Sequence, residues 1–332
     1  MTRSAPGIII TGTGTCTPSR IVTNDEISTL VDTTDEWIQS RTGIRERRFA
    51  EDNETSSTMG AKAAQAAMDA AGVSATDIDL IIVATLSPDM FFPSTASLIQ
   101  NRLGLRTITS FDLSAACSGF IYGLEVASCM MKSGAFLHAL VIGSDKLSAI
   151  LDWEDRGTCV LFGDGAGAVV LSKTDTEGSG VIDSYTGNDG SKPELLYMPG
   201  GGSAIPASID SVNQRQHFIK MNGREIFKIA VRWMEQSAKI MLERHGLKPE
   251  DINLIIPHQA NLRIIDALAR TTKIPKEKFF VNVDRYGNTS AASIPIALHE
   301  ARQKGCIQPG DYVLLVAFGA GLTWGSTLIK WQ

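Results

Sequence analysis

The sequence predicts a layered α/β protein built from two similar halves, and three observations support this fold class. Short apolar runs alternate with longer helical patterns along the 332 residues, as in folds that stack helices on strands. The apolar runs are continuous stretches of Val, Ile and Leu, which are typical of strands buried on both faces. The third observation is an internal repeat, which indicates that one structural unit occurs twice.

The first half, residues 1–173, begins with a strand and then alternates helices with strands. An Ala-rich segment that stops at a glycine predicts a helix at 57–73, and a second helix is expected at 117–133. The strands are predicted at 7–14, 78–85, 107–113 and 138–145, with two further strands around a Gly-rich bend at 158–172.

The remainder of the chain divides into a connecting segment and a second half. Residues 174–217 are rich in Gly, Pro and polar side chains, so we expect a connection with a few short strands. The second half, residues 218–332, contains an amphipathic pattern at 224–246 that predicts a helix ending at a glycine.

The repeat consists of three segments that recur in the same order. Asp77 aligns with Asp251, an offset of 251 − 77 = 174 residues, and at this offset Ala84 aligns with His258. Any two α/β units have similar alternations of apolar and polar residues, but three similar segments in the same order are poorly explained by chance. We therefore expect two related halves about a pseudo-twofold axis. The paired segments are 71–85 with 245–259, 111–120 with 283–293, and 160–171 with 316–329.

Composition and charge argue against several classes of function. A net charge of −5 disfavours broad binding to nucleic acid or to a membrane surface. The five cysteines form no CxxC pair, so we expect neither a zinc site nor a disulfide framework, and reduced thiols fit a cytoplasmic protein. The apolar run near the N-terminus is too short for a signal peptide, and no stretch approaches the roughly 18 apolar residues of a membrane-spanning helix.

Cys117, in "FDLSAACSGF" (111–120), stands where a predicted strand turns into a predicted helix. Small residues before it allow a sharp turn, and Gly119 allows close approach of a ligand or another backbone. The free N–H groups at the start of a helix favour a thiolate, so we expect the pKa of this thiol to be lowered. Most cysteines are simply small buried hydrophobic residues, and we interpret the other four cysteines in this way.

His258 and Asn288 each follow a predicted strand of the second half. Ligands of open α/β sheets bind beyond the carboxyl ends of strands, so both side chains can converge with Cys117 near the axis. Cysteine, histidine and asparagine form a known nucleophilic arrangement. Each also has an ordinary alternative, a satisfied core histidine or a turn asparagine. The Gly-rich "FGAG" (318–321) reads as a tight turn that can also offer a backbone N–H to an oxyanion.

Basic side chains cluster locally although the chain is acidic overall. Four arginines lie within residues 40–49, and Arg263 and Arg270 are seven residues apart on one expected helix face. A solvated surface is the default interpretation, and docking of an acidic partner or a phosphate group is the functional one. The glycines of "FGDGAG" (162–167) lack the following Lys-Ser/Thr of a phosphate-binding P-loop.

Several longer blocks resemble one family, the β-ketoacyl-acyl-carrier-protein synthases III, which initiate bacterial type II fatty acid synthesis. The resemblance spans essentially the whole chain. It implies a thiolase fold, five-layered α/β/α/β/α with two similar halves, and a homodimer without a bound cofactor or metal. The blocks are "TTDEWIQSRTGIRERR" (33–48), "FDLSAACSGF" (111–120), "DRGTCVLFGDGAGA" (155–168), "PHQANLRI" (257–264), "DRYGNTSAASIP" (284–295) and "FGAGLTWGS" (318–326).

The resemblance also implies roles for individual residues. Cys117 is the expected nucleophile, and His258 and Asn288 are expected to hold the malonyl thioester carbonyl. The backbone N–H groups of Cys117 and Ala320 are the expected oxyanion hole, although the family often has glycine at the latter position. Arg263 is expected to dock the carrier protein. The expected CoA-binding residues are Thr33, Trp37, Arg41, Arg156, Arg224 and Asn261, with Trp37 and Arg156 on either side of the adenine. The expected acyl pocket comprises Phe92, Leu147, Leu161, Met221 and Phe227.

The implied activity is a decarboxylative Claisen condensation of a short acyl-CoA, first of all acetyl-CoA, with malonyl-acyl carrier protein. The products are 3-oxoacyl-acyl carrier protein, CoA and carbon dioxide. Two alternatives stay open, a related thiolase-fold acyltransferase that uses longer acyl chains and a cysteine hydrolase that releases the free acid. A third, a catalytically silent protein-binding homologue, is opposed by the intact set of Cys117, His258 and Asn288.

Overall fold

A long mixed sheet, bent into two parts, organises the protein. The computed structural model describes residues 6–176 and 178–332. These residues form a nine-stranded sheet in the order β11 (Leu254–Pro257), β12 (Tyr312–Gly319), β13 (Thr323–Lys330), β8 (Gly180–Asn188), β1 (Gly7–Cys16), β7 (Gly165–Thr174), β6 (His138–Asp145), β4 (Leu80–Ala84) and β5 (Thr109–Leu113). The two parts join at β1 and β8, which pair only through Ile8 and Gly180.

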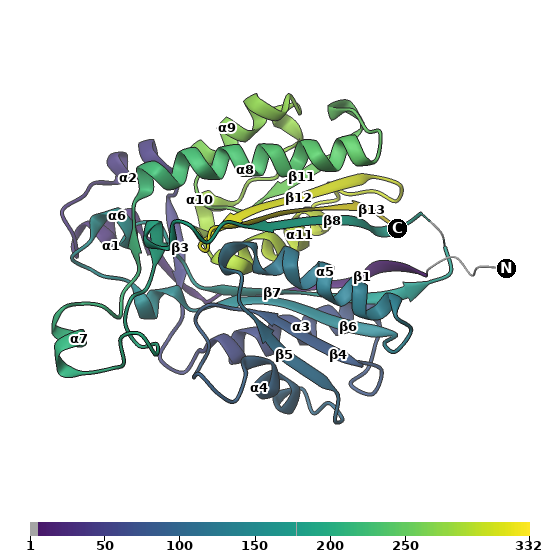
Figure 1. The fold of residues 1–332 in the computed structure, drawn as a ribbon, viewed down its shortest axis with the longest axis horizontal. Helices are drawn as coiled ribbons and strands as arrows, with labels where there is room; N and C mark the ends of the chain where they lie inside the picture. The colour runs from purple at the N-terminus through teal and green to yellow at the C-terminus, as the bar shows by residue number, and fades with distance from the viewer. Residues whose placement is uncertain (1–5, 177) are drawn as a thin grey trace.

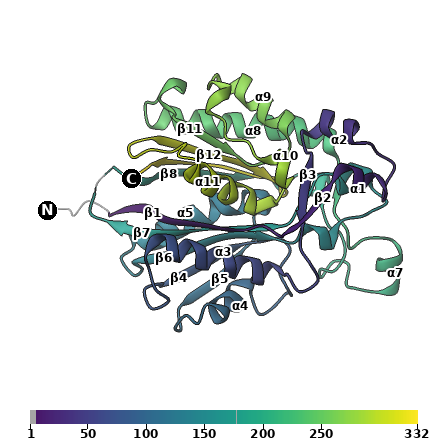
Figure 2. The same cartoon turned by 180° about the vertical axis from the view of Figure 1, so that it is seen from behind.

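Helices lie in three layers around the two parts of the sheet (Figures 1 and 2). The helices α5 (Gly119–Lys132) and α11 (Ser293–Gln303) lie between the parts and contact strands of both. One outer face is covered by α3 (Ser56–Ala71) and α4 (Thr95–Arg102), and the other by α8 (Gly223–Arg244) with α9 (Leu262–Thr272) packed beside it. The expected five-layered α/β/α/β/α architecture is therefore confirmed.

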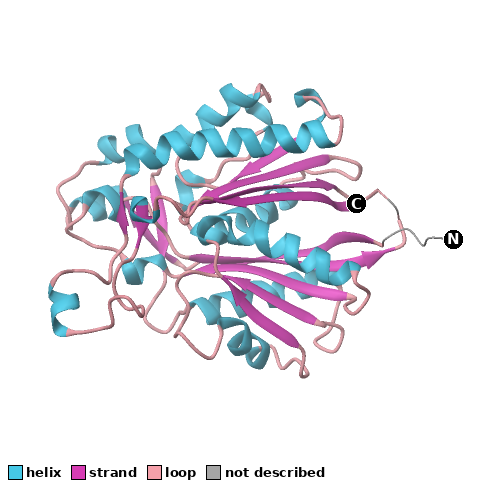
Figure 3. Ribbon diagram, viewed as in Figure 1, coloured by secondary structure: helices cyan, strands magenta, loops and turns pink. Residues whose placement is uncertain are grey.

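The remaining elements are short and gather at one end of the molecule, together with long loops (Figure 3). They include two small antiparallel pairs of strands, β2 with β3 and β9 with β10. Their bounds are β2 (Arg20–Thr23), β3 (Glu46–Phe49), β9 (Leu196–Tyr197), β10 (Lys220–Met221), α1 (Asn24–Ser28), α2 (Asp35–Thr42), α6 (Arg156–Cys159), α7 (Ile209–Asn213) and α10 (Val283–Tyr286).

The two parts of the sheet repeat one strand order. From the seam outwards, the first part runs β1-β7-β6-β4-β5 and the second runs β8-β13-β12-β11. Beside β11, at the place that β5 takes in the first part, Phe279 forms an isolated parallel bridge with Ile255. Asp77 and Asp251 cap equivalent turns, since each accepts a hydrogen bond of 2.7 Å from the backbone N–H three residues earlier. The two halves therefore share both topology and local detail.

The same offset relates two strained turns at the centre of the molecule. Ala116 and Ser290, which are 290 − 116 = 174 residues apart, both have positive φ, 46° and 51°. Each opens a 3₁₀ turn that leads into a central helix, α5 or α11. A positive φ strains the backbone of any residue other than glycine. The surrounding packing must therefore hold both turns in place.

Most predicted elements correspond to observed ones, and two regions differ. The first strand predicted within 158–172 is absent: residues 158 and 159 end α6, and β7 begins only at Gly165. The Asp155 side chain accepts a hydrogen bond from the N–H of Gly157 and so caps the helical turn. In the connecting segment 174–217, β8 is longer than the short strands expected there and pairs along β13. The division of the chain at 173 and 218 stays a prediction.

We predict that Gly143→Ala destabilises the fold. A Cβ atom on Gly143, in β6, would lie 2.3 Å from the carbonyl oxygen of Ala291, so the two halves would have to separate locally. Over-packing of this kind costs about 1–3 kcal/mol. Urea denaturation should therefore give a lower midpoint than for the matched variant Gly202→Ala, whose added Cβ meets nothing within 4 Å. Equal midpoints would show that the central contact is not tight.

Candidate active site

Cys117 lies in the 3₁₀ turn between β5 and α5, directly after Ala116 with its positive φ, as the strand-to-helix prediction requires. The side chain is 6% exposed. Two glycines make room for the turn: a Cβ on Gly119 would lie 2.9 Å from the Cβ of Ala84, and one on Gly319 would lie 2.8 Å from the backbone nitrogen of Cys117. The thiol is thus held at the join of the two halves.

The expected low pKa of this thiol is wrong. Burial raises the pKa of Cys117 to about 12, and the Ser290 side chain and the Cys117 backbone N–H offset only part of that rise. The positive end of α5 favours the thiolate, but burial removes its hydration, and this loss of hydration is the larger effect on the pKa. Cys117 is therefore a neutral thiol at neutral pH in the free protein.

His258 directly follows β11 and is also buried, at 3% exposed. Its backbone N–H donates to Val316 at 2.7 Å, which fixes the residue against β12. Its ring nitrogen Nδ1 lies 2.7 Å from the Ser293 hydroxyl oxygen. Burial lowers the pKa of the imidazole to about 3, so the ring is neutral with one N–H at working pH.

Asn288 is held by its backbone and by its own side-chain oxygen. The backbone N–H donates to Leu161 at 2.9 Å, and the carbonyl accepts from Gly163 at 3.0 Å. The side-chain Oδ1 accepts the N–H of Ser290 at 2.9 Å. Because that acceptor is occupied, the Nδ2 amide remains to donate a hydrogen bond into the site.

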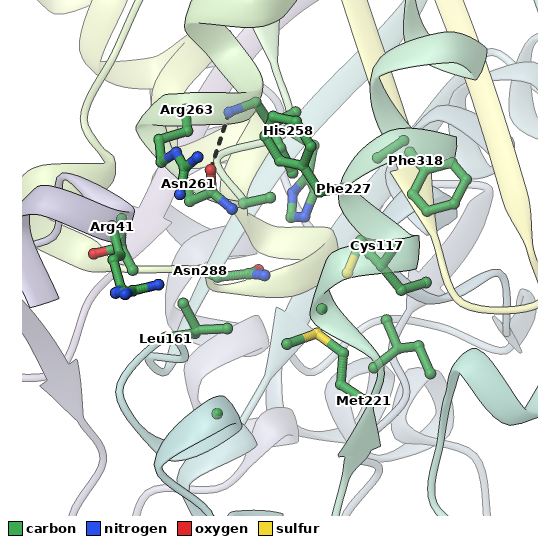
Figure 4. A pocket seen from close by; sticks show the side chains of 18 of the residues that line it. Arg41, Cys117, Leu161, Met221, Phe227, His258, Asn261, Arg263, Asn288 and Phe318 are labelled. Atoms are coloured by element: carbon green, nitrogen blue, oxygen red, sulfur yellow. Dashed lines mark hydrogen bonds between the residues drawn. The ribbon is translucent and has the colours of Figure 1, made fainter. Parts of the chain in front are cut away.

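Cys117, His258 and Asn288 line one cavity of about 650 Å³ (Figure 4). Their side chains come from three separate elements of both halves, and each points towards the space between them in Figure 4. Of the other expected site residues, those lining the same cavity are Trp37, Arg41, Leu161, Met221, Arg224, Phe227, Asn261 and Arg263.

A second cavity, of about 390 Å³, also borders Cys117. Cys117 lines both cavities, and the second also contains the expected residues Leu147 and Ala320. The sequence patterns did not identify Ser290, which lines this cavity with a buried side chain beside the Cys117 thiol. Its place in the repeat, opposite Ala116, was the available signal.

Three expected site residues line neither cavity. Phe92 is 84% exposed, Thr33 is half-buried away from the cavity walls, and Arg156 lies with its guanidinium 4.8 Å from the centre of the Trp37 ring. The guanidinium of Arg41 lies at the same distance from that ring. Trp37 thus carries two arginines at the mouth of the larger cavity.

No group of three His, Cys, Asp or Glu side chains in 6–176 and 178–332 is arranged to hold a metal ion. Over the same residues, no helix has the length and apolar character needed to cross a bilayer.

Several known proteins resemble this chain in sequence and in fold over nearly its whole length. The family model of 3-oxoacyl-[acyl-carrier-protein] synthase III matches residues 111–190. A second model, of the C-terminal part of the same family, matches residues 242–331. The β-ketoacyl-[acyl-carrier-protein] synthase III of Caldanaerobacter subterraneus subsp. tengcongensis is 51% identical over 99% of this chain and 98% of its own. The chain belongs to the β-ketoacyl-acyl-carrier-protein synthase III family.

Solved structures of the family agree with this assignment. The synthase III of Aquifex aeolicus superposes with a TM-score of 0.91 at 50% identity, covering 98% of this chain and all of that one. The synthase III of Thermus thermophilus gives 0.91 at 44% identity, covering 98% and 99%. The protein is therefore a thiolase-fold acyltransferase of the synthase III family, and the hydrolase and longer-chain alternatives are not favoured.

We predict that alkylation of Cys117 by iodoacetamide accelerates with pH without a plateau near neutrality. Because burial raises the pKa to about 12, the reactive thiolate fraction rises about tenfold for each pH unit well below that value. Peptide mass spectrometry can follow Cys117 alone between about pH 6 and 10. A rate that levels off below pH 8 would contradict the neutral thiol.

Proposed function

We propose that Cys117 takes the acyl group of a short acyl-CoA as a thioester and that His258 and Asn288 then support its condensation with malonyl-acyl carrier protein. The chain thereby makes 3-oxoacyl-acyl carrier protein, CoA and carbon dioxide, the initiating step of fatty acid synthesis. The observation that carries these assignments is the geometry of the larger cavity, where one buried thiol faces two neutral hydrogen-bond donors.

The first step is acyl transfer to the neutral thiol. The Cys117 sulfur bonds to the acyl carbon, the bond to the CoA sulfur breaks, and the thiol proton ends on the departing CoA thiol, so charge and protons balance. The N–H groups of Cys117 and Ala320 are proposed to hold the oxyanion. In support, the Thr323 hydroxyl lies within hydrogen-bond distance of the carbonyls of Ala115 (2.9 Å) and Ala320 (3.0 Å), which ties the two turns together.

The second step is decarboxylation of the malonyl thioester. Loss of carbon dioxide leaves an enolate, whose oxygen carries new negative charge. The imidazole of His258 and the Nδ2 amide of Asn288 can each donate to that oxygen, and two neutral donors stabilise it without a metal. The enolate carbon then attacks the acyl carbon of the Cys117 thioester, the bond from that carbon to the Cys117 sulfur breaks, and the released thiolate takes up one proton from solvent.

The CoA moiety is proposed to lie in the larger cavity, against Trp37, Arg41, Arg224 and Asn261. A planar adenine between Trp37 and Arg156 needs a separation of roughly 7–8 Å, two van der Waals contacts of about 3.5–4.0 Å. Since the guanidinium now lies 4.8 Å from the ring, Arg156 has to swing outward when CoA binds. A role for Thr33 has no support from the cavity lining.

We propose a homodimer in which Phe92 serves a neighbouring copy. Phe91 and Phe92 are 81% and 84% exposed, and such a pair on the surface of one chain marks an interaction site. Phe92 can shape an acyl pocket only if a second copy brings it there, because it lines neither cavity of its own chain. A cytoplasmic location fits the free thiols of all five cysteines.

We predict that Cys117→Ser abolishes acyl-enzyme formation from acetyl-CoA. The serine hydroxyl is a far weaker nucleophile than a thiol, whereas His258 and Asn288 remain in place, so decarboxylation of the malonyl thioester should survive. Intact-protein mass spectrometry measures the first and carbon dioxide release the second. Cys129→Ser, an exposed cysteine outside both cavities, is the matched control. Full condensation by Cys117→Ser would overturn the assignment.

The hydrolase alternative gives the opposite result with acetyl-CoA alone. A synthase should accumulate a stable acyl-enzyme that waits for the malonyl thioester, whereas a hydrolase should turn acetyl-CoA over to acetate. Rapid steady release of acetate would therefore contradict the proposed function.

We predict that Arg263→Glu weakens use of the acidic carrier protein. Arg263 is exposed at the mouth of the larger cavity, with its guanidinium 5.7 Å from the Phe227 ring. Reversing this charge should raise KM for malonyl-acyl carrier protein several-fold and leave the reaction of Cys117 with acetyl-CoA unchanged. Lys132→Glu, the same change at the exposed end of α5, is the control. An unchanged KM would remove Arg263 from the docking surface.

A further inference from the structure

The position of the single imidazole proton of His258 decides whether the ring can act as a donor. At working pH the ring is neutral, so either Nδ1 or Nε2 carries the hydrogen. His258 lines the larger cavity, and Nδ1 is engaged with Ser293 away from it. Only the tautomer protonated at Nε2 can therefore donate a hydrogen bond into the cavity. Something in the protein has to select that tautomer.

The contacts of Ser293 make this selection. Its hydroxyl oxygen accepts the backbone N–H of Gln259 at 3.3 Å and lies 2.7 Å from Nδ1 of His258. Ser293 is 2% exposed and His258 3%, so bulk water does not replace either contact. A serine hydroxyl has one hydrogen to donate, and within 6–176 and 178–332 the only acceptor at hydrogen-bond distance from it is Nδ1 of His258.

The two tautomers differ in how many of these groups are satisfied. If Nδ1 carried the hydrogen, it would donate to Ser293, and the buried serine hydrogen would have no acceptor in the described chain. If Nε2 carries the hydrogen, Ser293 donates to Nδ1 while still accepting from Gln259, so the Ser293 hydroxyl and Nδ1 are both paired and Nε2–H faces the cavity. A buried donor left unpaired is destabilising. The second arrangement therefore prevails.

The first half shows that Ser293 and His258 belong together. At the offset of 174 residues, Ser293 corresponds to Gly119 and His258 to Ala84. Gly119 and Ala84 face each other too, since a Cβ on Gly119 would lie 2.9 Å from the Cβ of Ala84. The same two positions thus hold apolar residues, Gly119 and Ala84, in the first half and polar residues, Ser293 and His258, in the second. A serine occurs where an imidazole needs orienting.

We propose that Ser293 is the positioning residue that holds His258 in the tautomer protonated at Nε2, so that the ring can donate to the enolate oxygen. The proposal rests on the role given to His258 in the proposed function. It assigns no contact between Ser293 and the substrate, and it concerns the malonyl step only. Acyl transfer to Cys117 proceeds without it.

The direct test is ¹⁵N NMR of the full chain with labelled histidine. Two-bond couplings from the ring carbon-bound protons distinguish a protonated Nε2 from a protonated Nδ1, and His258→Ala identifies the signal among the five histidines. The wild type should show Nε2–H alone for His258. Ser293→Ala should show a mixture or a shift towards Nδ1–H. A wild-type ring protonated at Nδ1, or an unchanged tautomer in Ser293→Ala, would overturn the proposal.

Kinetics separate this proposal from the proposed function itself. Ser293→Ala should lower kcat for condensation by up to about the hundredfold to thousandfold that loss of one oxyanion donor costs, and acylation of Cys117 by acetyl-CoA should stay unchanged. Ser293→Thr, which keeps a hydroxyl, should recover part of the loss. Ser237→Ala removes another fully buried hydroxyl, on α8 and outside both cavities, and should leave both steps unchanged. If His258→Ala condenses normally, the role of His258 fails; if only Ser293→Ala does, the positioning role fails.

Discussion

The site depends on one steric constraint, the close approach of two left-handed turns at the centre of the molecule. One turn carries Cys117 and the other, at Ser290, follows Asn288. Each turn packs against a strand of the other half, and glycine makes room at both contacts: Gly143 of β6 lies against the carbonyl of Ala291, and Gly319 of β12 against the backbone of Cys117. The strand order of the two halves brings these turns together from opposite ends of the chain.

Burial at this junction sets the electrostatics of the site. It raises the pKa of Cys117 to about 12 and lowers that of His258 to about 3, so both groups are neutral before substrate arrives. Burial also raises the pKa of Asp145, whose carboxyl accepts hydrogen bonds from Ser87 and from the backbone of Leu86 and lies beside the turn at Ala291. A site of neutral donors binds the uncharged thioester carbonyl of the malonyl group and strengthens its hydrogen bonds as negative charge develops on that oxygen, which is the pattern that accelerates a reaction.

Much of this arrangement could be predicted from the sequence, and the failures share a cause. The repeat indicated that Cys117 and His258 would meet, because equivalent strand ends of related halves converge. The prediction of a lowered pKa for Cys117 was wrong because both halves together bury the thiol. The local pattern of a helix end does not reveal that burial. Ser290 and Ser293 were missed because a serine acquires its role only from a partner about 170 or 35 residues away in the chain. Phe92 matched a pocket position of the family but lies exposed on the surface of its own chain, which a local sequence pattern does not reveal.

The most direct test of the two-step account replaces Asn288 by Asp, which keeps the size of the side chain and turns its donating amide into a carboxylate. Intact mass spectrometry would follow the enzyme first with acetyl-CoA and then with malonyl-acyl carrier protein. The account predicts that Asn288→Asp gains one acetyl group as fast as the wild type and then retains it during the chase, because a carboxylate repels the enolate. Discharge of the acetyl group at the wild-type rate would contradict the account.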